Sequence, residues 1–492
     1  MFLSIVKTIA DQYDTATLIK TIISTGLGVF SFHTLFYWFI GVFWTRKFPP
    51  AKKQHKYAIM IPARNEEDVI GNLIKSIRRQ DYPQELITVF VVADNCTDST
   101  AEVARSLGVN VYEHKNPDER TKGFALRYLF DQVKRDYGIE AFEGYFIFDS
   151  DNLLNKDYIS RMNESFDAGE KIITSYRNTK NFDECWVAST YALHWLRSIR
   201  YRHRARSLFR LATNIQGTGF LFANELVKDG WNYTSLTEDR AFTADAVAHG
   251  YPISYNDAAE FFDEQPVSLK IALRQRVRWA KGHLQAFVET GGLLFTNIFL
   301  GNRFKKREKG RKMTKKDIIE SLRHRWASFD TLGQLIPSSI INLFVWIIVS
   351  ILIGMCNHYT YGINHERVFN GGSWLAISLR FVFGDILVNM PAGVRAMLIG
   401  ALLVIFWRLI MRLAGDLQKI MVGIYVFFVE RKRIIPIKWY KKILYCITWP
   451  TFDLIGRYAM YAALFMKVEW KPIPHKSKVT IEDIESDKGK KN

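Results

Sequence analysis

The stretch Tyr145-Phe146-Ile147-Phe148-Asp149-Ser150-Asp151 decides the fold, because a run of four apolar residues ends in two carboxylates. The run has the length and composition of a buried strand, and the carboxylates follow at its carboxyl end. Carboxylate oxygens suit Mg²⁺ or Mn²⁺, which keep several waters and share their coordination shell with substrate phosphates. We therefore expect Asp151 and Asp149 to hold a divalent cation, although Asp-x-Asp also occurs in ordinary solvated turns.

Strands and helices alternate on both sides of this stretch, from residue 56 to about residue 265. The alternation is typical of a Rossmann-like α/β domain with a mostly parallel sheet. Ligands in such sheets bind beyond the carboxyl ends of the strands, so Asp94 and Asp149 are expected to face one crevice. Strands are predicted at 57–61, 87–93, 109–112 and 145–148, and helices at 66–79, 100–107 and 122–133.

Composition points to a membrane-associated chain and not to a nucleic-acid-binding one. The chain has 492 residues, a formal net charge of +18, 48% hydrophobic residues and 14% aromatic residues. Its basic residues cluster beside apolar segments, as at Arg46-Lys47 and Arg431-Lys432-Arg433. That arrangement is typical of the cytoplasmic flanks of membrane segments. The four cysteines are far apart, so we expect reduced thiols.

Long apolar segments predict an α-helical transmembrane region with interfacial amphipathic helices. Residues 21–44 carry no formal charge and could span a bilayer, with a cleaved signal peptide as the alternative. Further spans are predicted at 338–356, 394–429 and 443–466, and interfacial helices at 268–296 and 317–330.

The path of the C-terminal half through the bilayer stays open. Either residues 374–392 also cross, or the chain is re-entrant around Pro450. Ionisable residues inside spans face a protein interior or a watery path. The candidates, which would line a channel or form intramembrane ion pairs, are Arg408, Arg412, Asp453 and Arg457.

These patterns divide the chain into five parts. They are an N-terminal membrane segment (1–46), a cytoplasmic α/β catalytic domain (47–266), interfacial helices (267–330), a C-terminal transmembrane region (331–470) and a polar tail (471–492). The tail is expected to be disordered from about Lys476. We expect a multi-pass protein of the plasma membrane.

Two positions at predicted element ends carry charges that need a partner. Asp94 ends the second strand and could accept hydrogen bonds from a base or ribose, while Asp98 is expected to be the N-cap of the next helix. Lys122 opens a predicted helix, where the helix dipole disfavours a cation. An anionic partner such as a phosphate would explain this lysine, and a solvated side chain is the alternative.

Several motifs in order resemble the D, DxD, TED and QxxRW series of processive family 2 glycosyltransferases, which include cellulose, chitin and hyaluronan synthases. The motifs are Asp94, Asp149-Ser150-Asp151, Thr237-Glu238-Asp239 and Gln275-Arg276-Val277-Arg278-Trp279. The resemblance covers residues from about 20 to 470. It implies a cytoplasmic GT-A domain, a UDP-sugar donor, a divalent metal, an inverting reaction and a polymer threaded through the chain's own membrane helices.

The resemblance also implies a role for each matching residue. Asp239 would be the general base, assisted by Glu238, and Asp151 and Asp149 would hold Mg²⁺ or Mn²⁺. An anchor at the membrane interface is the alternative for Trp279. Donor binding would fall to Ala63, Glu66, Asp94, Lys122, Asp149, Gln275, Arg278 and Trp279. Acceptor binding would fall to Gly217, Thr218, Gly219 and Trp279.

The sequence indicates the sugar and the linkage less clearly than it indicates the reaction. The sequence QRVRWAKG at 275–282 and Glu264-Gln265-Pro266 resemble glucan synthases, so we expect UDP-glucose and a β-glucan, cellulose-like or of mixed linkage. Alternatives are a hyaluronan- or chitin-type synthase, a non-processive transferase that glycosylates a lipid, and a transporter or scaffold with a silent α/β domain. The expected partners are the donor, the polysaccharide and the bilayer, without nucleic acid; oligomeric state stays open.

Overall fold

The computed structural model describes residues 32–302, 313–344, 381, 392–475 and 477–489. The chain divides into two units, one made of Met1–Ser31 and Pro337–Lys419, the other of Phe32–Ile336 and Ile420–Asn492. Every residue predicted for the active site belongs to the second unit.

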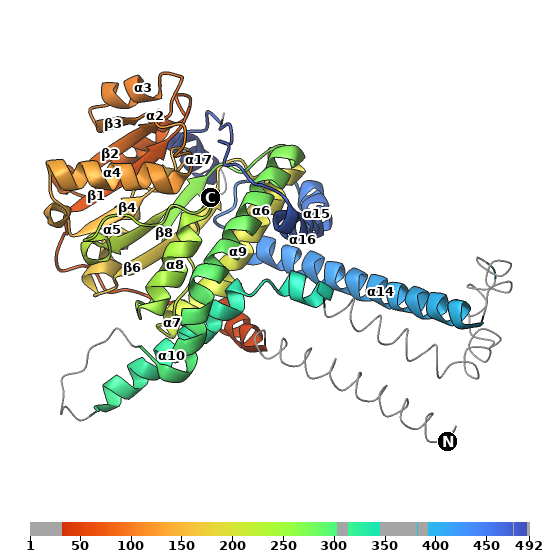
Figure 1. Ribbon diagram of the computed structural model, residues 1–492. Coiled ribbons are helices and arrows are strands. Elements are labelled where there is room, and N and C mark those ends of the chain that lie inside the picture. The colour runs from red at the N-terminus through yellow and green to blue at the C-terminus, as the bar shows by residue number, and fades with distance from the viewer. Residues whose placement is uncertain (1–31, 303–312, 345–380, 382–391, 476, 490–492) are drawn as a thin grey trace. The chain divides into compact units, whose positions relative to one another are not determined.

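An eight-stranded sheet forms the centre of the second unit, in the order β3-β2-β1-β4-β7-β6-β8-β5 (Figure 1). β1 pairs in parallel with β2 and β4, and β2 pairs in parallel with β3. The strands are β1 (Tyr57–Ala63), β2 (Ile87–Asp94), β3 (Asn110–His114), β4 (Gly144–Ile147), β5 (Leu153–Leu154), β6 (Ile172–Thr179), β7 (Phe220–Ala223) and β8 (Ser254–Asp263).

The sheet is mixed, and six of its eight strands run in the same direction, in agreement with the mostly parallel sheet that the sequence predicted. β7 runs antiparallel to β4 and β6, and β5 runs antiparallel to β8, while β6 and β8 are parallel. The sequence signal covered only the first four strands, where apolar runs alternate with helices. β8 was missed because its sequence, SYNDAAEFFD, is polar, although nine of its ten residues are buried.

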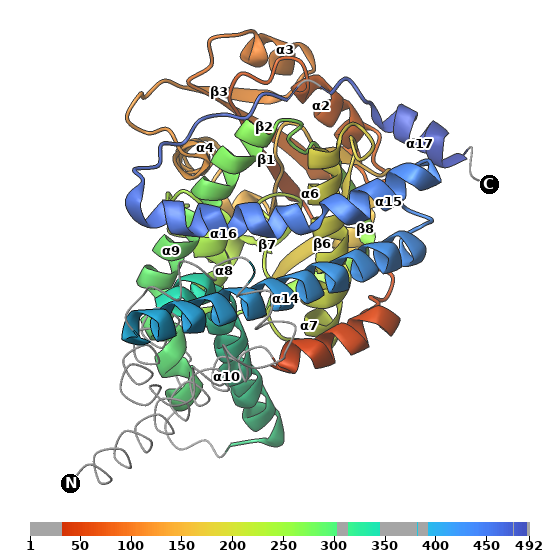
Figure 2. The ribbon, with the colours of Figure 1, turned by 90° about the vertical axis from the view of Figure 1, so that its right-hand side faces the viewer.

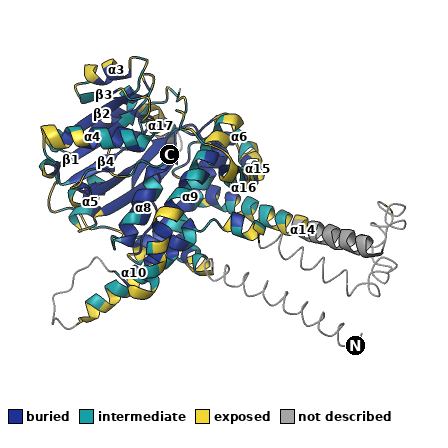
Figure 3. Cartoon of the chain, in the orientation of Figure 1, coloured by how far each residue is buried: buried dark blue, intermediate teal, exposed yellow. Residues whose placement is uncertain are grey.

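Helices cover both faces of the sheet, and its strands are buried between them (Figure 3). On one face α4, α8 and α9 pack through Phe130, Phe242 and Leu294. On the other, α2 and α5 pack through Leu73 and Met162. The helices are α2 (Ile70–Arg78), α3 (Thr100–Ser106), α4 (Lys122–Asp136), α5 (Tyr158–Asp167), α6 (Trp186–Ser198), α7 (Arg204–Leu208), α8 (Glu238–Ala248), α9 (Leu269–Leu300) and α10 (Lys315–Leu335).

The C-terminal part of the second unit returns to this domain. α15 (Trp439–Thr448) and α16 (Pro450–Phe465) lie against α6, and α16 also packs along α9 (Figure 2). α17 (Ile481–Gly489) is an ordered helix where a disordered tail was expected. That expectation was wrong because Ile481 and Ile484 are buried against Leu153 and Phe262.

The predicted membrane segments are described only in part. Residues 32–43 are helical, α14 (Ala392–Val429) covers the segment 394–429, and most of 338–356 and 374–392 lies outside the described residues. In the part of the chain that is described, no helix combines the length and the apolarity that crossing a bilayer requires. Arg412 pairs with Asp416 on α14 at 2.7 Å, which is the ion-pair alternative for that arginine.

Gly282 marks the closest approach of α9 to the segment that carries Thr237. A Cβ at Gly282 would lie 2.2 Å from Thr237 Oγ1 and 2.8 Å from Thr237 Cβ. Gly292 lies on the same helix, and a Cβ there would meet no described atom within 4 Å. The two glycines therefore form a matched pair, one in a tight contact and the other in open space.

We expect Gly282→Ala to destabilise the protein and Gly292→Ala not to. Overpacking at Gly282 should cost about 1–3 kcal/mol, which opposes the gain of about 1 kcal/mol in helix propensity that both alanines bring. Thermal unfolding of the purified full chain in detergent measures the difference. Equal shifts of the midpoint in both variants would contradict the close contact.

Candidate active site

One cavity of about 470 Å³ opens at the carboxyl ends of β1, β2 and β4. It brings together nearly all residues that the sequence singled out, from segments far apart in the chain. Those that line it are Ala63, Glu66, Asp94, Lys122, Asp149, Asp151, Gly217, Glu238, Asp239, Gln275, Arg278 and Trp279.

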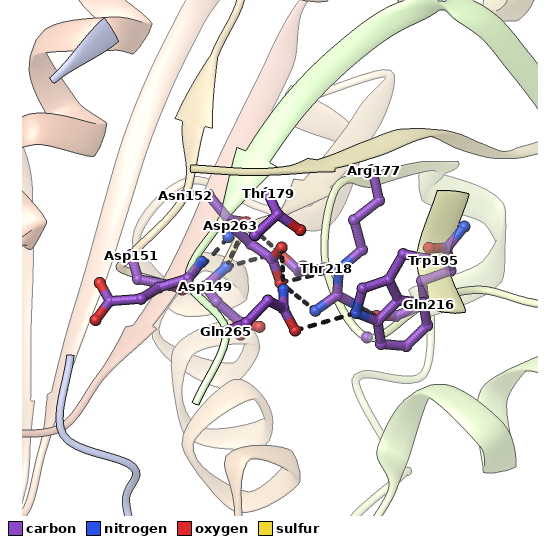
Figure 4. A network of polar contacts seen from close by, with 12 residues as sticks. Asp149, Asp151, Asn152, Arg177, Thr179, Trp195, Gln216, Thr218, Asp263 and Gln265 are labelled. Atoms are coloured by element: carbon purple, nitrogen blue, oxygen red, sulfur yellow. Dashed lines mark hydrogen bonds and ion pairs between the residues drawn. The ribbon is translucent and has the colours of Figure 1, made fainter. Parts of the chain in front are cut away.

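Thr218 and Gly219 were predicted to bind the acceptor but are not among the lining residues. Thr218 is buried, and its hydroxyl accepts a hydrogen bond from the Asp149 N–H at 2.8 Å and donates one to Asn152 (Figure 4). Gly219 has a positive φ of 64°, and a Cβ there would lie 2.3 Å from the Phe261 ring. Both residues therefore shape the loop that carries Asp149.

Asp94 is held at the end of β2 by two cationic or ionisable groups. Arg64 forms an ion pair with its carboxylate, and His114 Nδ1 lies 2.9 Å from Asp94 Oδ1. The guanidinium group of Arg64 also stacks 4.7 Å from the ring centre of Trp470. The carboxylate is thus fixed where a base or ribose could reach it.

Lys122 is buried among acidic groups, so the alternative of a solvated lysine is wrong. Its Nζ lies 2.5 Å from Asp149 Oδ1, 2.7 Å from the Gly217 carbonyl oxygen and 3.5 Å from Glu238 Oε1. Burial lowers the pKa of Lys122, but Asp149 and Glu238 outweigh burial and raise it. The lysine is therefore charged at neutral pH and joins the Asp-x-Asp segment to the start of α8.

Asp151 supplies a buried carboxylate that stays ionised. Its Oδ2 accepts a hydrogen bond from the Glu264 N–H at 2.7 Å. Burial raises the pKa of Asp151, but His475 and Lys180 outweigh it and hold the pKa below its usual value. An ionised carboxylate inside a cavity is a suitable ligand for a hard cation.

The donor set fits a divalent cation that completes its shell from substrate. Among the described residues, no group of three or more His, Cys, Asp or Glu side chains could hold a metal ion. Asp149 and Asp151 both line the cavity and offer only carboxylate oxygens. Mg²⁺ and Mn²⁺ accept such partial protein ligation, with waters and phosphate oxygens as the remaining ligands.

Glu238 and Asp239 occupy the first turn of α8, where the helix dipole favours negative charge. Burial raises the pKa of Glu238 to about 7, even though Lys122 acts to lower it. Asp239 lies beside the Gly217 segment, since a Cβ at Gly217 would come 3.7 Å from Asp239 Oδ2. The pair thus faces the loop that was predicted to meet the acceptor.

The side chains of α9 form the opposite wall of the cavity. Arg278 Nη1 donates to the Leu236 carbonyl at 2.9 Å, which ties α9 to the segment before Glu238. Trp279 lines the cavity together with Trp195, with ring centres 5.8 Å apart and an angle of 65° between the rings. The ring of Trp279 is therefore available to a ligand in the cavity.

A polar network that the sequence did not reveal supports this wall (Figure 4). Arg177 donates to Asp263 at 2.9 Å and to the Gln216 carbonyl at 2.6 Å, and its guanidinium lies 4.0 Å from the ring centre of Trp195. Gln265 accepts from Trp195 Nε1 at 3.2 Å. Only Glu264-Gln265-Pro266 gave any sequence signal for this network, because Arg177 lies in a strand that was not predicted.

The C-terminal segment also contributes to the cavity through Trp470 and His475. His475 Nδ1 lies 2.9 Å from Glu66 Oε1. Burial lowers the pKa of His475, but Asp151 and Glu66 outweigh burial and raise it to about 10. A protonated histidine from the chain's C-terminal part thus sits among the donor-side carboxylates.

The part of the chain that holds most of these residues is similar to known proteins. Residues 54–282 match the family described as "Glycosyltransferase like family 2". The chain is 25% identical over 256 residues to the probable glycosyltransferase YdaM of Bacillus subtilis (strain 168), covering 47% of this chain and 56% of that protein.

The chain is also similar to two further proteins. The chain is 23% identical over 229 residues to a poly-beta-1,6-N-acetyl-D-glucosamine synthase of Staphylococcus epidermidis, covering 46% of this chain and 54% of that protein. It thus spans about half the length of the curated relatives it matches. A mannosyltransferase of Pyrobaculum calidifontis, solved with GDP-Man and Mn²⁺, aligns at 16% identity and a TM-score of 0.46 over 79% of this chain and 99% of that chain.

The raised pKa of Glu238 predicts a pH-dependent penalty on folding. A carboxyl whose pKa rises from 4.5 to about 7 on folding stabilises the native state below pH 4.5, and this contribution is lost as pH rises through 7. We expect Glu238→Gln to become more stable relative to the parent protein across that window, by up to about 3 kcal/mol. Unfolding midpoints from pH 4.5 to 8 measure it. The exposed position Glu289→Gln is the control, and a constant difference for Glu238→Gln would contradict the assignment.

Proposed function

We propose that this family 2 glycosyltransferase domain transfers a sugar from a UDP-sugar to the end of a growing saccharide, with inversion at the anomeric carbon. The whole chain would be a membrane-embedded processive synthase. UDP-glucose is the first donor to test and a β-glucan the first product, because of the motif resemblance to glucan synthases. The catalytic domain would face the cytoplasm, at the plasma membrane.

The proposal rests on one observation, the convergence of three motifs on one cavity. Asp149 and Asp151, then Glu238 and Asp239, then Arg278 on α9 all line it. A catalytically silent domain would have no reason to hold several carboxylates together in a partly closed space, where their mutual repulsion is costly.

The donor side is built to receive a diphosphate. Arg278 and Lys122 place two cations beside Asp149, and a guanidinium can bind phosphate oxygens with two parallel hydrogen bonds. A bound Mg²⁺ or Mn²⁺ would supply Lewis-acid stabilisation of the charge that grows on the leaving diphosphate. Asp94, fixed by Arg64 and His114, would accept hydrogen bonds from the uridine part.

Asp239 would act as the general base. The acceptor hydroxyl oxygen forms a bond to the anomeric carbon as the bond from that carbon to the UDP oxygen breaks, and the hydroxyl proton passes to the Asp239 carboxylate. A positioned base contributes about 10²- to 10⁴-fold. Glu238, bound to Lys122, would hold the start of α8 in place.

The acceptor side offers flat apolar surfaces to a sugar ring. Trp279 lines the cavity beside Trp195, whose ring also contacts the guanidinium group of Arg177, and the Gly217 segment lies beside Asp239. Stacking of the terminal sugar on an indole would orient its hydroxyl toward the base. The linkage formed would depend on which hydroxyl this stacking presents.

We expect the purified full chain, in detergent or lipid nanodiscs with Mg²⁺ or Mn²⁺, to release UDP from one UDP-sugar and to make a high-mass product. The panel contains UDP-glucose, UDP-N-acetylglucosamine and UDP-glucuronate. Asp239→Asn should bind UDP as tightly as the parent protein but lose at least about 100-fold in transfer, because the base is gone. Normal turnover by Asp239→Asn would remove the base assignment.

The product separates the alternatives. A single sugar on a lipid would indicate a non-processive lipid glycosyltransferase, and absence of turnover with every UDP-sugar would favour a transporter or scaffold. Digestion of a polymeric product with linkage-specific glucanases would identify a glucan. A product that resists these enzymes would move the proposal to the hyaluronan or chitin type.

We expect Asp151→Asn to weaken UDP binding in the presence of Mg²⁺ or Mn²⁺ by about tenfold or more, and to leave metal-free UDP binding nearly unchanged. The reason is that an amide oxygen is a weaker ligand for a hard cation than a carboxylate. Calorimetric titration of UDP with and without metal measures both values. Asp229→Asn, at an exposed position outside the cavity, is the control. An unchanged metal dependence in Asp151→Asn would contradict its role as ligand.

A further inference from the structure

The cavity has a second charged wall, formed by Arg202 and Arg240, that the proposed reaction does not use. Arg202 lies in a short π-helix (Ile199–His203) between α6 and α7, and Arg240 follows Asp239 on α8. Both side chains line the same cavity as the donor-binding residues. π-helical turns are rare and frequently occur at functional sites.

The guanidinium groups of Arg202 and Arg240 form no ion pair or hydrogen bond with a described side chain. Asp453 acts on Arg202 and Asp239 acts on Arg240, but each offsets only part of the effect of burial, since the pKa of both arginines stays lowered. The neighbouring buried arginines differ, since Arg206 binds both oxygens of Asp330 at 2.6 and 2.8 Å. Arg204 binds both oxygens of Asp257 in the same way, at 2.8 and 2.9 Å.

The wall is electropositive, and its charges are close enough to oppose one another. Burial, together with Arg197 and Arg240, lowers the pKa of Arg202 to about 9. Burial and Arg240 also lower the pKa of His283 to about 3, so this cavity-lining histidine is neutral at pH 7. Enclosing like charges without a counter-ion is costly, and an anionic ligand would remove that cost.

The same part of the cavity holds buried polar atoms without partners. Asn214 and Gln216 are only 7% and 6% exposed, and the side-chain oxygens of both lack a hydrogen bond, as does that of Gln275. All three line the cavity. Buried amide oxygens require donors, and the hydroxyl groups of a sugar bound beside Trp279 would supply them.

We propose that the acceptor is an acidic saccharide, whose carboxylate or phosphate binds Arg202 and Arg240 while its nucleophilic hydroxyl lies at Asp239. The free hydroxyls of the same sugar would satisfy the amide oxygens of Asn214 and Gln216. A fork of guanidinium N–H donors matches the planar carboxylate and the phosphate alike. Arg202 and Arg240 are then specificity residues that select the charge of the acceptor.

This inference rests on the proposed function and narrows it. UDP-glucose remains compatible as a donor where glucose is added to an acidic primer or alternates with an acidic sugar. A plain neutral glucan would supply neither guanidinium group with a bound counter-ion, and is therefore disfavoured as the natural product. The acceptor site thus indicates the charge of the acceptor, which the donor motifs do not.

The test measures acceptor binding to the full chain in nanodiscs, without turnover. The probes are cellobiose, the uronic acid disaccharide glucuronosyl-β-1,4-glucose and cellobiose 6′-phosphate, added in the presence of UDP and Mg²⁺. Quenching of tryptophan fluorescence reports binding, because Trp195 and Trp279 line the cavity. We expect at least one acidic disaccharide to bind tenfold or more tightly than cellobiose, and Arg202→Gln and Arg240→Gln each to reduce that ratio to about two or less.

Arg323→Gln, at an exposed position on α10, is the charge-matched control and should retain the full ratio. Equal binding of acidic and neutral disaccharides by the parent protein would overturn the inference, and this outcome does not depend on whether the variants fold. Displacement of the disaccharide by an anionic phospholipid at lower concentration would also overturn it, in favour of a lipid site. Turnover of a UDP-sugar without any preference for charged over neutral acceptors would refute this inference alone. Charge-selective acceptor binding without turnover would refute only the proposed transferase activity.

Discussion

The buried ammonium group of Lys122 is the interaction on which the rest of the site depends. It contacts a carboxylate after β4, a carbonyl in the segment before β7 and a carboxylate at the start of α8. Without this cation, Glu238 would be buried close to Asp239 without compensation, which disfavours its ionised form. One side chain at the start of α4 therefore joins separate segments into a single site and offsets part of the cost of burying Glu238.

Close backbone packing then fixes where Asp239, the proposed base, lies. A Cβ at Gly123 would come 2.2 Å from the Tyr233 carbonyl oxygen, and one at Gly282 would come 2.2 Å from Thr237. The segment that leads into α8 is thus held from one side by α4 and from the other by α9. Since Lys122 precedes Gly123, and Arg278 lies one helical turn before Gly282, the same two helices supply both the cations and the contacts. The two helices therefore fix the position of Asp239.

The sequence predicted the donor half of this site better than the rest, for a physical reason. β4 and the carboxylates that follow it are neighbours in the sequence, so the pattern is visible without the fold. A lysine at a helix start, such as Lys122, by itself predicts an anionic partner. Arg177 on β6, Asp263 on β8 and Trp195 on α6 meet only through tertiary packing, and the polar sequence of β8 shows no apolar alternation. His475 was missed for a similar reason. The polar composition of the C-terminal segment predicts a disordered tail, whereas Ile481 and Ile484 pack on the domain.

The two halves of the cavity differ in how their charges are balanced. On the donor side Arg64 pairs with Asp94, Lys122 with Asp149, and His475 with Glu66. A nucleotide diphosphate that binds together with a divalent cation would replace these partners. A phosphate would take the place of the carboxylate at Lys122, and the metal would take the place of the ammonium group at Asp149. The net charge of the site would therefore change little. On the proposed acceptor side, Arg202 and Arg240 form no ion pair with a described carboxylate, and nearby Asp453 and Asp239 only partly offset the burial that lowers their pKa values. Under the proposal above, an acidic acceptor would supply a bound counter-ion there, so this wall would select by charge and the donor wall by geometry.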